Sequence, residues 1–449
     1  LVDMYAKCGM LARSQRVLEE LPIRNIVSWN ALISGYAQQG ECHGTLRSFE
    51  HMQSEGLSPD AVTFTCILKA CSSAGDIDVG KRIHDEIARR GLLEKDVVLG
   101  TALVDMYATC NVLGKAKHVL EHLPFRNAAS WSALISGYTQ QGQGHEALNC
   151  YEKMQNEGLS PDVVTFICIL KACGSIGAID KGKQIHEEIV RMGLMEKDIA
   201  LGNALLDMYI KCGMLEKAQN VFEELPFHDV VSWSTLIFGY VQEDQGHEAL
   251  NCLHRMQSEC LSPDVVTFIC MLKACGSIGA VSKGKQIHEE ISSKCILQEN
   301  IVLGTTLVDM YAKGGMLEKA KDVLDELPIR DIVSWNALIV GYAQQGQGHE
   351  ALNCFEQMQN EGLSPDEVTF VCVLSACSHS GLLVEAQMLF GNMARKYNIS
   401  PSIEHQSCML IFLGCAGQFD EVTSVIKVMA SCQYPDLWLV VLGACRKWG

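Results

Sequence analysis

Residues 27–36 read VSWNALISGY, and the phrase returns with small changes at residues 129–138, 231–240 and 333–342. Its tryptophans, Trp29, Trp131, Trp233 and Trp335, stand 102 residues apart, so one unit has been copied four times along the chain. Apolar residues recur in the phrase at the spacing of a helix face, with Ser28 as a candidate N-cap and Gly40 as a stop signal. The phrase therefore predicts a short helix that recurs once per unit.

Each unit divides into three sub-units of 35, 36 and 31 residues, which are 26–60, 61–96 and 97–127 in the first copy. Each sub-unit reads as two short helices separated by Gly, Pro, Asn and Asp turn signals. A hairpin of this size cannot bury its own apolar face, but stacked neighbours can share one. The sequence predicts an all-α solenoid of about thirteen helical hairpins, and it disfavours propellers, leucine-rich horseshoes and α/β folds.

The composition is that of a folded, acidic protein. The 449 residues are 48% hydrophobic and 20% charged, and 36 basic against 53 acidic side chains give a formal charge of −17. No uncharged apolar run approaches the roughly 18 residues that a membrane span needs. The 21 cysteines are expected to act as small core residues in a reducing compartment and to form no disulfide scaffold.

Four phrases carry a resemblance to a known family: VSWNALISGYAQQG from Val27, FICILKAC from Phe166, GKQIH from Gly182 and ALLDMYIKCG from Ala204. Together with the rotating lengths of 35, 36 and 31, they resemble the plant PLS subclass of the pentatricopeptide repeat family, whose standard, long and short repeats alternate. Tetratricopeptide arrays keep a constant 34-residue period. The resemblance implies a right-handed α-solenoid that binds single-stranded RNA.

The resemblance also divides the chain into segments. Residues 1–25 are expected to be a partial short repeat, and 26–127, 128–229 and 230–331 are three triplets. Residues 332–436 hold a standard repeat and the terminal long and short repeats, and 437–449 resemble the start of an extension motif. The chain is therefore expected to stop before any deaminase domain.

In the family, the fifth and last residues of each standard or short repeat read one RNA base. Here the pairs are all small and polar: Asn30 with Asp60, Thr101 with Asn127, Ser132 with Asp162, Asn203 with Asp229, Ser234 with Asp264, Thr305 with Asp331, and Asn336 with Asp366. The long repeats carry Thr65, Ile167, Ile269 and Val371 at the fifth position, so we expect them to read no base. The alternative interpretation is that a polar residue near a helix start is an N-cap.

The resemblance assigns two further roles. The second residue of each repeat would clamp the bases, and it is Val27, Val98, Ala129, Ala200, Val231, Val302 or Val333 in the standard and short repeats. Core packing is the alternative for these apolar residues. Lys7, Lys211 and Lys313 match a phosphate-facing position, at which another copy has Thr109, and a solvated lysine at a helix end is the alternative. The acidic total charge predicts modest affinity with a shallow salt dependence.

Three patterns resemble catalytic or metal sites. Residues 177–184 nearly spell a phosphate-binding loop, but Gln184 replaces the required hydroxyl and no strand precedes the loop. His84, His186 and His288 each begin an H-x-E pattern, but the chain lacks the C-x-x-C of zinc deaminases. Cysteine pairs such as Cys66 and Cys71 are about 140° apart around a helix. We therefore expect no enzyme activity, no cofactor and no metal site.

The functional hypothesis is a sequence-specific RNA-binding protein that provides specificity for C-to-U editing in a mitochondrion or chloroplast. A deaminase would be supplied in trans or by a missing domain, and no membrane is involved. The alternatives are a peptide-binding scaffold of tetratricopeptide type and an organelle RNA stability or splicing factor.

Overall fold

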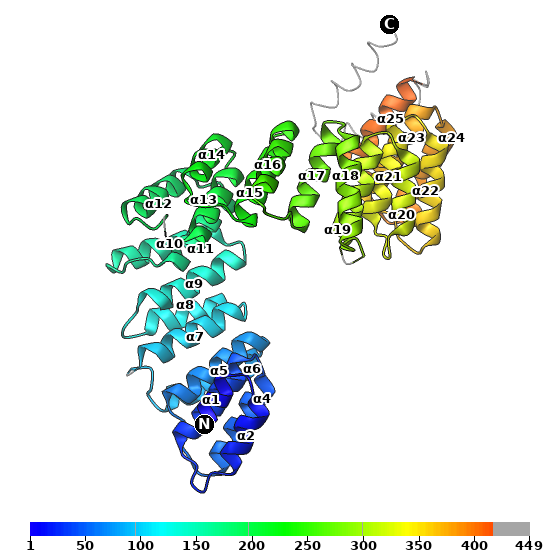
Figure 1. Cartoon of the computed structure of the whole chain (residues 1–449). Coiled ribbons are helices and arrows are strands. Elements are labelled where there is room, and N and C mark those ends of the chain that lie inside the picture. The colour runs from blue at the N-terminus through cyan, green and yellow to red at the C-terminus, as the bar shows by residue number, and fades with distance from the viewer. Residues whose placement is uncertain (95, 196, 299, 416–449) are drawn as a thin grey trace, which may run out of the picture. The chain divides into compact units, whose positions relative to one another are not determined.

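The computed structural model describes residues 1–94, 96–195, 197–298 and 300–415, and the regular structure in these ranges consists of 25 α-helices (Figure 1). The chain divides into two compact units, the first from Leu1 to His228 and the second beginning at Asp229. This confirms the predicted all-α fold. Residues 416–436 of the expected terminal short repeat and the expected extension start at 437–449 lie outside the described residues.

The first unit contains seven helix pairs. They are α1 (Val2–Lys7) with α2 (Leu11–Glu19), α3 (Ile26–Gln38) with α4 (Cys42–Ser54), α5 (Ala61–Ala74) with α6 (Ile77–Arg89), α7 (Val97–Thr109) with α8 (Leu113–His122), α9 (Ala128–Gln140) with α10 (Gly144–Asn156), α11 (Val163–Ile176) with α12 (Ile179–Arg191), and α13 (Ile199–Lys211) with α14 (Leu215–Glu224).

The described part of the second unit continues the pattern. Its helices are α15 (Val230–Gln242) with α16 (Gly246–Ser258), α17 (Val265–Ser277) with α18 (Val281–Ser293), α19 (Ile301–Lys313) with α20 (Leu317–Glu326), α21 (Ile332–Gln344) with α22 (Gly348–Asn360), α23 (Glu367–Ser380) with α24 (Leu383–Lys396), and then α25 (Ile403–Cys415).

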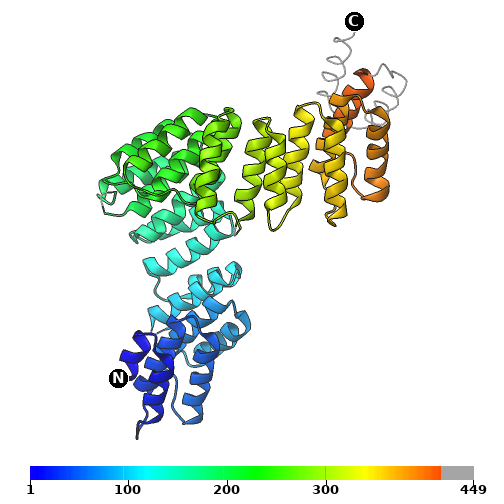
Figure 2. The same cartoon turned by 45° about the vertical axis from the view of Figure 1, so that its right-hand side comes forward.

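Each unit has two layers of helices. The first helices of the hairpins, which carry odd numbers, pack against the first helices of neighbouring hairpins. The second helices pack against the first helix of their own hairpin and of the next one, and neighbouring second helices meet through long side chains such as Tyr151 and Glu188. Figure 2 shows the stacked hairpins of each unit. Residues of successive repeats therefore come closest together on the first-helix layer.

Local hydrogen bonds determine where the first helices begin. The residue before each of α3 to α23 in this layer is an Asp or Asn whose side chain accepts a hydrogen bond from a backbone N–H of the first turn. Asn25 is the N-cap of α3, so the prediction of Ser28 as the cap was wrong: Ser28 completes a capping box. The helices α3 to α25 of this layer begin where the predicted sub-units begin, while the grouping into triplets stays a prediction.

Close contacts between first helices account for the glycine in the repeated phrase. A Cβ atom at Gly137 in α9 would lie 2.8 Å from Ala108 Cβ in α7 and 2.8 Å from Leu113 Cδ2. Gly341 has the same tight environment against Ala312 and Leu317. The glycine is needed because neighbouring first helices approach too closely for any side chain.

The buried tryptophans join the two helices of a hairpin. Trp131 Nε1 in α9 donates to Glu157 Oε2 at the end of α10 at 2.9 Å, and Arg126 Nη2 lies 2.7 Å from the other oxygen of that carboxylate. The first and fourth copies repeat this arrangement, and the third copy keeps the bond from Trp233 to Glu259. Every described helix is too short or too polar to cross a lipid bilayer.

Candidate nucleic-acid interface

The predicted base-reading residues at the fifth positions all lie inside first helices. Six of the seven side chains are between 6% and 9% exposed, and Thr101 is half-buried. None of them is an N-cap, so the capping interpretation is wrong for the fifth position. It is right for the last position, because the last residue of each repeat caps the first helix of the next repeat.

The structure brings the fifth and last residues together in four repeats. Asn30 Nδ2 donates to Asp60 Oδ1 at 3.0 Å. The same contact joins three further pairs, namely Thr101 to Asn127 at 3.3 Å, Ser132 to Asp162 at 3.4 Å and Asn336 to Asp366 at 3.4 Å. Residues 26 to 30 positions apart in sequence therefore present their polar atoms side by side, in matching places along the first-helix layer.

Two of the remaining pairs show no such bond among the described residues. Ser234 Oγ donates to the carbonyl oxygen of Val230 at 2.7 Å, and Thr305 Oγ1 is buried without a hydrogen-bond partner. Asn203 and Asp229 belong to different units. Asn336 Oδ1 is also buried and has no hydrogen-bond partner. At two predicted reading positions, therefore, a buried polar atom of the fifth residue forms no hydrogen bond within the protein.

The carboxylates of Asp60 and Asp366 are held in the ionised form. Burial acts to raise the pKa of Asp60, but the backbone N–H of Thr63 and the amide of Asn30 donate to its carboxylate, and their net effect lowers the pKa. Asp366 has a lowered pKa for the same reasons, with Thr369 and Asn336 as donors. An ionised carboxylate accepts but cannot donate, which orients the Asn side chain beside it with its N–H₂ group toward the aspartate.

The second-position residues form a row of exposed apolar side chains. Val27 is the most exposed at 70% and Val231 the least at 52%, while Val98, Val302 and Val333 lie between them and Ala129 and Ala200 are exposed as well. The valines of the long repeats, Val62, Val164, Val266 and Val368, are similarly exposed. The alternative of core packing is wrong, because these side chains point into solvent three residues before a buried fifth-position residue.

The predicted phosphate-facing lysines are ion-paired within their own helices. Lys211 Nζ lies 2.8 Å from Asp207 Oδ2, and Lys7 with Asp3 and Lys313 with Asp309 have the same spacing and distance. The copy with Thr109 lacks the pair, and the Thr109 hydroxyl donates to the backbone carbonyl of Asp105. Each lysine therefore carries its own counter-charge one turn earlier on the helix.

The residues of the H-x-E pattern have structural partners. His84 Nδ1 is 2.9 Å from the Tyr107 hydroxyl, and His186 with Tyr209 and His288 with Tyr311 repeat the contact at 2.9 and 3.0 Å. Burial lowers the pKa of all three histidines. The described residues include no group of three His, Cys, Asp or Glu side chains that could hold a metal ion.

The other two patterns are also part of the repeat. Gly177 ends α11 in the left-handed conformation and Gly182 lies inside α12, so the loop-like sequence joins two helices. Cys71 is fully buried and burial raises its pKa to about 12, which keeps the thiol protonated and unreactive.

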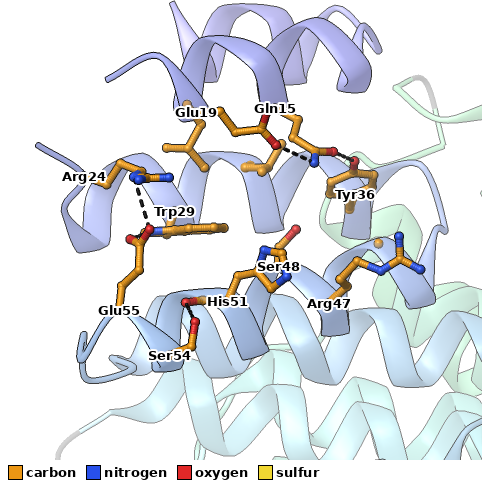
Figure 3. A pocket seen from close by; sticks show the side chains of 13 residues that line it. Gln15, Glu19, Arg24, Trp29, Tyr36, Arg47, Ser48, His51, Ser54 and Glu55 are labelled. Atoms are coloured by element: carbon orange, nitrogen blue, oxygen red, sulfur yellow. Dashed lines mark hydrogen bonds and ion pairs between the residues drawn. The ribbon is translucent and has the colours of Figure 1, made fainter. Parts of the chain in front are cut away.

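One cavity, of about 210 Å³, lies beside Trp29 between α2, α3 and α4 (Figure 3). The second copy has Lys117 and Glu146 in place of Gln15 and Gly44, and these two side chains approach to 3.8 Å. A Cβ at Gly44 would lie 2.3 Å from Tyr36 Cδ1, so the Tyr36 ring packs directly against this glycine. Most of the lining comes from second helices, so the cavity is not part of the row of reading positions.

The comparisons with known proteins follow the same periodicity. The PPR repeat family model matches residues 24–73, 126–175, 228–277 and 330–379, and the PPR repeat model matches 62–92, 203–230, 305–332 and 368–397. The chain belongs to the pentatricopeptide repeat family. The predicted base-reading positions of this pentatricopeptide repeat protein, apart from Thr101, lie inside segments that these models match.

Curated relatives of this pentatricopeptide repeat protein come from Arabidopsis thaliana. A chloroplastic pentatricopeptide repeat-containing protein is 35% identical over 446 residues, covering 99% of this chain and 55% of the relative. A mitochondrial one is 33% identical over 430 residues, covering 96% of this chain and 62% of the relative. The chain therefore spans a little more than half the length of these relatives.

Solved structures share the fold. The crystal structure of PPR10 from maize has a TM-score of 0.64 at 20% identity, covering 99% of this chain and 69% of PPR10. PPR10 in complex with an 18-nucleotide PSAJ RNA element has a TM-score of 0.65 at 17% identity, covering 99% of this chain and 75% of PPR10. The likeness confirms a solenoid of helical hairpins.

Proposed function

We propose that this pentatricopeptide repeat protein binds single-stranded RNA in a sequence-dependent manner, with one base for each standard or short repeat. The observation that carries the proposal is a pair of polar residues, at the fifth and last positions of a repeat, that are hydrogen-bonded to each other in four repeats. An exposed valine or alanine at the second position accompanies each pair. Recognition of splayed bases requires this combination of polar atoms for the base edge and apolar surface for its face.

The variation of the fifth residue supports reading rather than a purely structural role. Asn30, Ser132, Ser234 and Asn336 occupy the same place in four nearly identical standard repeats, with the same backbone conformation around them. A residue that only maintained the helix would have no reason to alternate between Asn and Ser. The last-position residue is Asp in all four of these repeats, and only the fifth residue varies. This pattern is expected if the fifth residue selects the base and the aspartate has the same role in every repeat.

The family's pairing rules give a specific target. Asn with Asp favours U, Thr or Ser with Asp favours G, and Thr with Asn favours A, so the seven pairs in order correspond to 5′-U-x-A-G-x-U-G-x-G-U-3′. The x positions lie opposite long repeats, whose fifth residues are mostly apolar. Subclass membership of the PLS type is part of this proposal, because it defines which repeats read.

The biological role that we propose is specificity for C-to-U editing of an organelle transcript, with the deamination chemistry supplied by another polypeptide or domain. Relatives named as chloroplastic and mitochondrial support an organelle location. Comparison of organelle transcripts from plants with and without the gene tests this role: loss of a C-to-U change near a match to the target supports it, whereas altered transcript abundance or splicing with editing intact contradicts it.

Fluorescence anisotropy with the purified chain tests the binding proposal. We expect the target decamer, with adenine at each x, to bind at least ten-fold more tightly than a scrambled RNA of the same composition. Changing a base opposite a long repeat should have little effect, while changing one opposite a reading pair should cost about 1–3 kcal/mol. Equal binding of target and scrambled RNA would contradict the proposal.

A further inference from the structure

The long repeats carry a positive charge that the base-reading hypothesis does not use. Lys69, Lys171 and Lys273 occupy the ninth position of the first three long repeats, on α5, α11 and α17, and all three side chains are exposed. Among the described residues none of their ammonium groups has an ion pair or hydrogen bond. The lysines of the short repeats differ, because Lys211 and Lys313 are each paired with an aspartate at 2.8 Å.

Helix geometry places these lysines beside the reading row. Lys69 follows the fifth-position Thr65 by four residues, so both lie on one face of α5, about 6 Å apart along the axis. Asp105 stands in the same relation to the reading residue Thr101 on α7. Desolvation raises the pKa of Asp105 and the charge of Lys69 opposes this shift, which indicates that the two side chains are near one another. The ninth positions therefore form a second row next to the fifth positions.

The junctions of long and short repeats concentrate this charge. In the second copy, the side-chain stem of Lys211 crosses α11 at Gly174, where an added Cβ would lie 3.3 Å from Lys211 Cδ, only three residues after Lys171. The net charge of this group is +1, from the two lysines Lys171 and Lys211 and the one aspartate Asp207. The third copy repeats the arrangement with Gly276 and Lys313.

The first and fourth copies lack it. Ser72 and Thr109 replace Gly174 and Lys211 in the first copy, so Lys69 and Asp105 leave no net charge. The fourth long repeat has Ser375 at the ninth position.

We propose that the long repeats hold the RNA backbone, with Lys171 and Lys273, and more weakly Lys69, binding phosphate groups of the nucleotides that these repeats leave unread. The proposal rests on the proposed RNA-binding function and adds a role for the repeats that read no base. It also answers the objection from total charge, because Lys171 and Lys273 have no paired carboxylate among the described residues. A phosphate can approach Lys171 or Lys273 without displacing a carboxylate.

Salt-dependent RNA binding of single variants tests the proposal. Lys273→Gln is compared with Lys285→Gln, which removes the same charge from an exposed, unpaired lysine on the second helix of the same hairpin, α18. We expect Lys273→Gln to reduce the slope of log K against log salt by about 0.7, the value for one phosphate contact on a single strand, and Lys285→Gln to leave it unchanged. At 0.1 M salt the loss of affinity would be about five-fold if the variants bind equally at 1 M.

Further variants test the size and the sign of the change in the slope of log K against log salt. Lys171→Gln combined with Lys273→Gln should reduce the slope by about 1.4, equally for target and scrambled RNA, with base preference retained. Ser375→Lys should increase it. Equal slopes for wild type and Lys273→Gln, or equal losses for Lys273→Gln and Lys285→Gln, would overturn the inference. If wild type shows no preference for the target while the lysine variants still lower the slope, the proposed base reading fails and the lysine contacts stand.

Discussion

The first two copies of the 102-residue unit share a buried tryptophan and its hydrogen bond, and they differ in residues around it. Trp29 and Trp131 are both buried and both donate to a glutamate at 2.9 Å. Between the second helices, however, the second copy has the Lys117 and Glu146 pair, where the first has Gln15, Gly44 and a cavity. The tryptophan contact has been kept, while both buried and exposed residues near it have diverged, as Thr45 and Ser48 of the first copy are Ala147 and Cys150 in the second.

The largest expected effect concerns the tryptophans. Trp131→Ala should lower the free energy of unfolding by about 3–5 kcal/mol, because it removes a buried indole and its hydrogen bond. Trp29→Ala should cost roughly 1 kcal/mol less, because the cavity beside Trp29 means that fewer packing contacts are lost. Urea denaturation followed by circular dichroism measures both. Val27→Ala, at an exposed site, is the control and should change little; equal losses at the two tryptophans would show that the cavity has no energetic effect.

Reading specificity comes next in size. Ser132→Asn gives the second standard repeat the Asn and Asp combination of the first, so the preferred base at the fourth target position should change from G to U. The discrimination between the two bases should be about 1–3 kcal/mol, measured by anisotropy with the two decamers. Thr65→Asn in a long repeat is the matched control, for which we expect no new base preference.

The half-buried histidines of the long repeats should make the stability of the first three copies depend on pH. Because burial lowers the pKa of His84, His186 and His288 in the folded state, the unfolded chain binds more protons below about pH 6.5, and stability falls as the pH falls from there through the lowered pKa. Replacing all three by Phe, the residue at the matching Phe390 of the fourth copy, should reduce the loss of Tm between pH 7 and pH 5. His145→Gln, at an exposed site, should leave that loss unchanged, and an unaltered pH dependence in the triple variant would contradict the assignment.

The smallest effect concerns the surface between the second helices. Combining Gln15→Lys with Gly44→Glu would give the first copy the ion pair of the second. We expect a net loss of about 1 kcal/mol, because a Cβ at residue 44 would lie 2.3 Å from Tyr36 Cδ1 and must displace that ring, and Gln15→Lys removes the acceptor of the Tyr36 hydroxyl. The exposed ion pair offsets only about 0.2–1 kcal/mol of this at low salt and nothing in 1 M salt. Each single variant, measured by urea denaturation, separates the two contributions; additivity of the single effects would show that no pair forms.

The sequence was most informative where structure is local. The sub-unit boundaries drawn from the sequence coincide with the starts of the first helices, which are determined locally by an Asp or Asn cap and the adjacent first turn. Ser28 shows the limit of such reasoning, because Ser at the third helical position and Ser at the cap are both common, and only the hydrogen bonds distinguish them. The all-α repeat fold followed from periodicity, and the family followed from the repeated phrases and the lengths of the sub-units.

Only the tertiary structure decided which side chains meet and which face solvent. Exposure of Val27 and its counterparts, and the contact between Asn30 and Asp60 across 30 residues, depend on how successive first helices pack, and periodicity does not encode that packing. Short-range hydrogen bonds within a repeat determine where its helices begin, whereas packing against the neighbouring repeats determines which of its side chains are exposed.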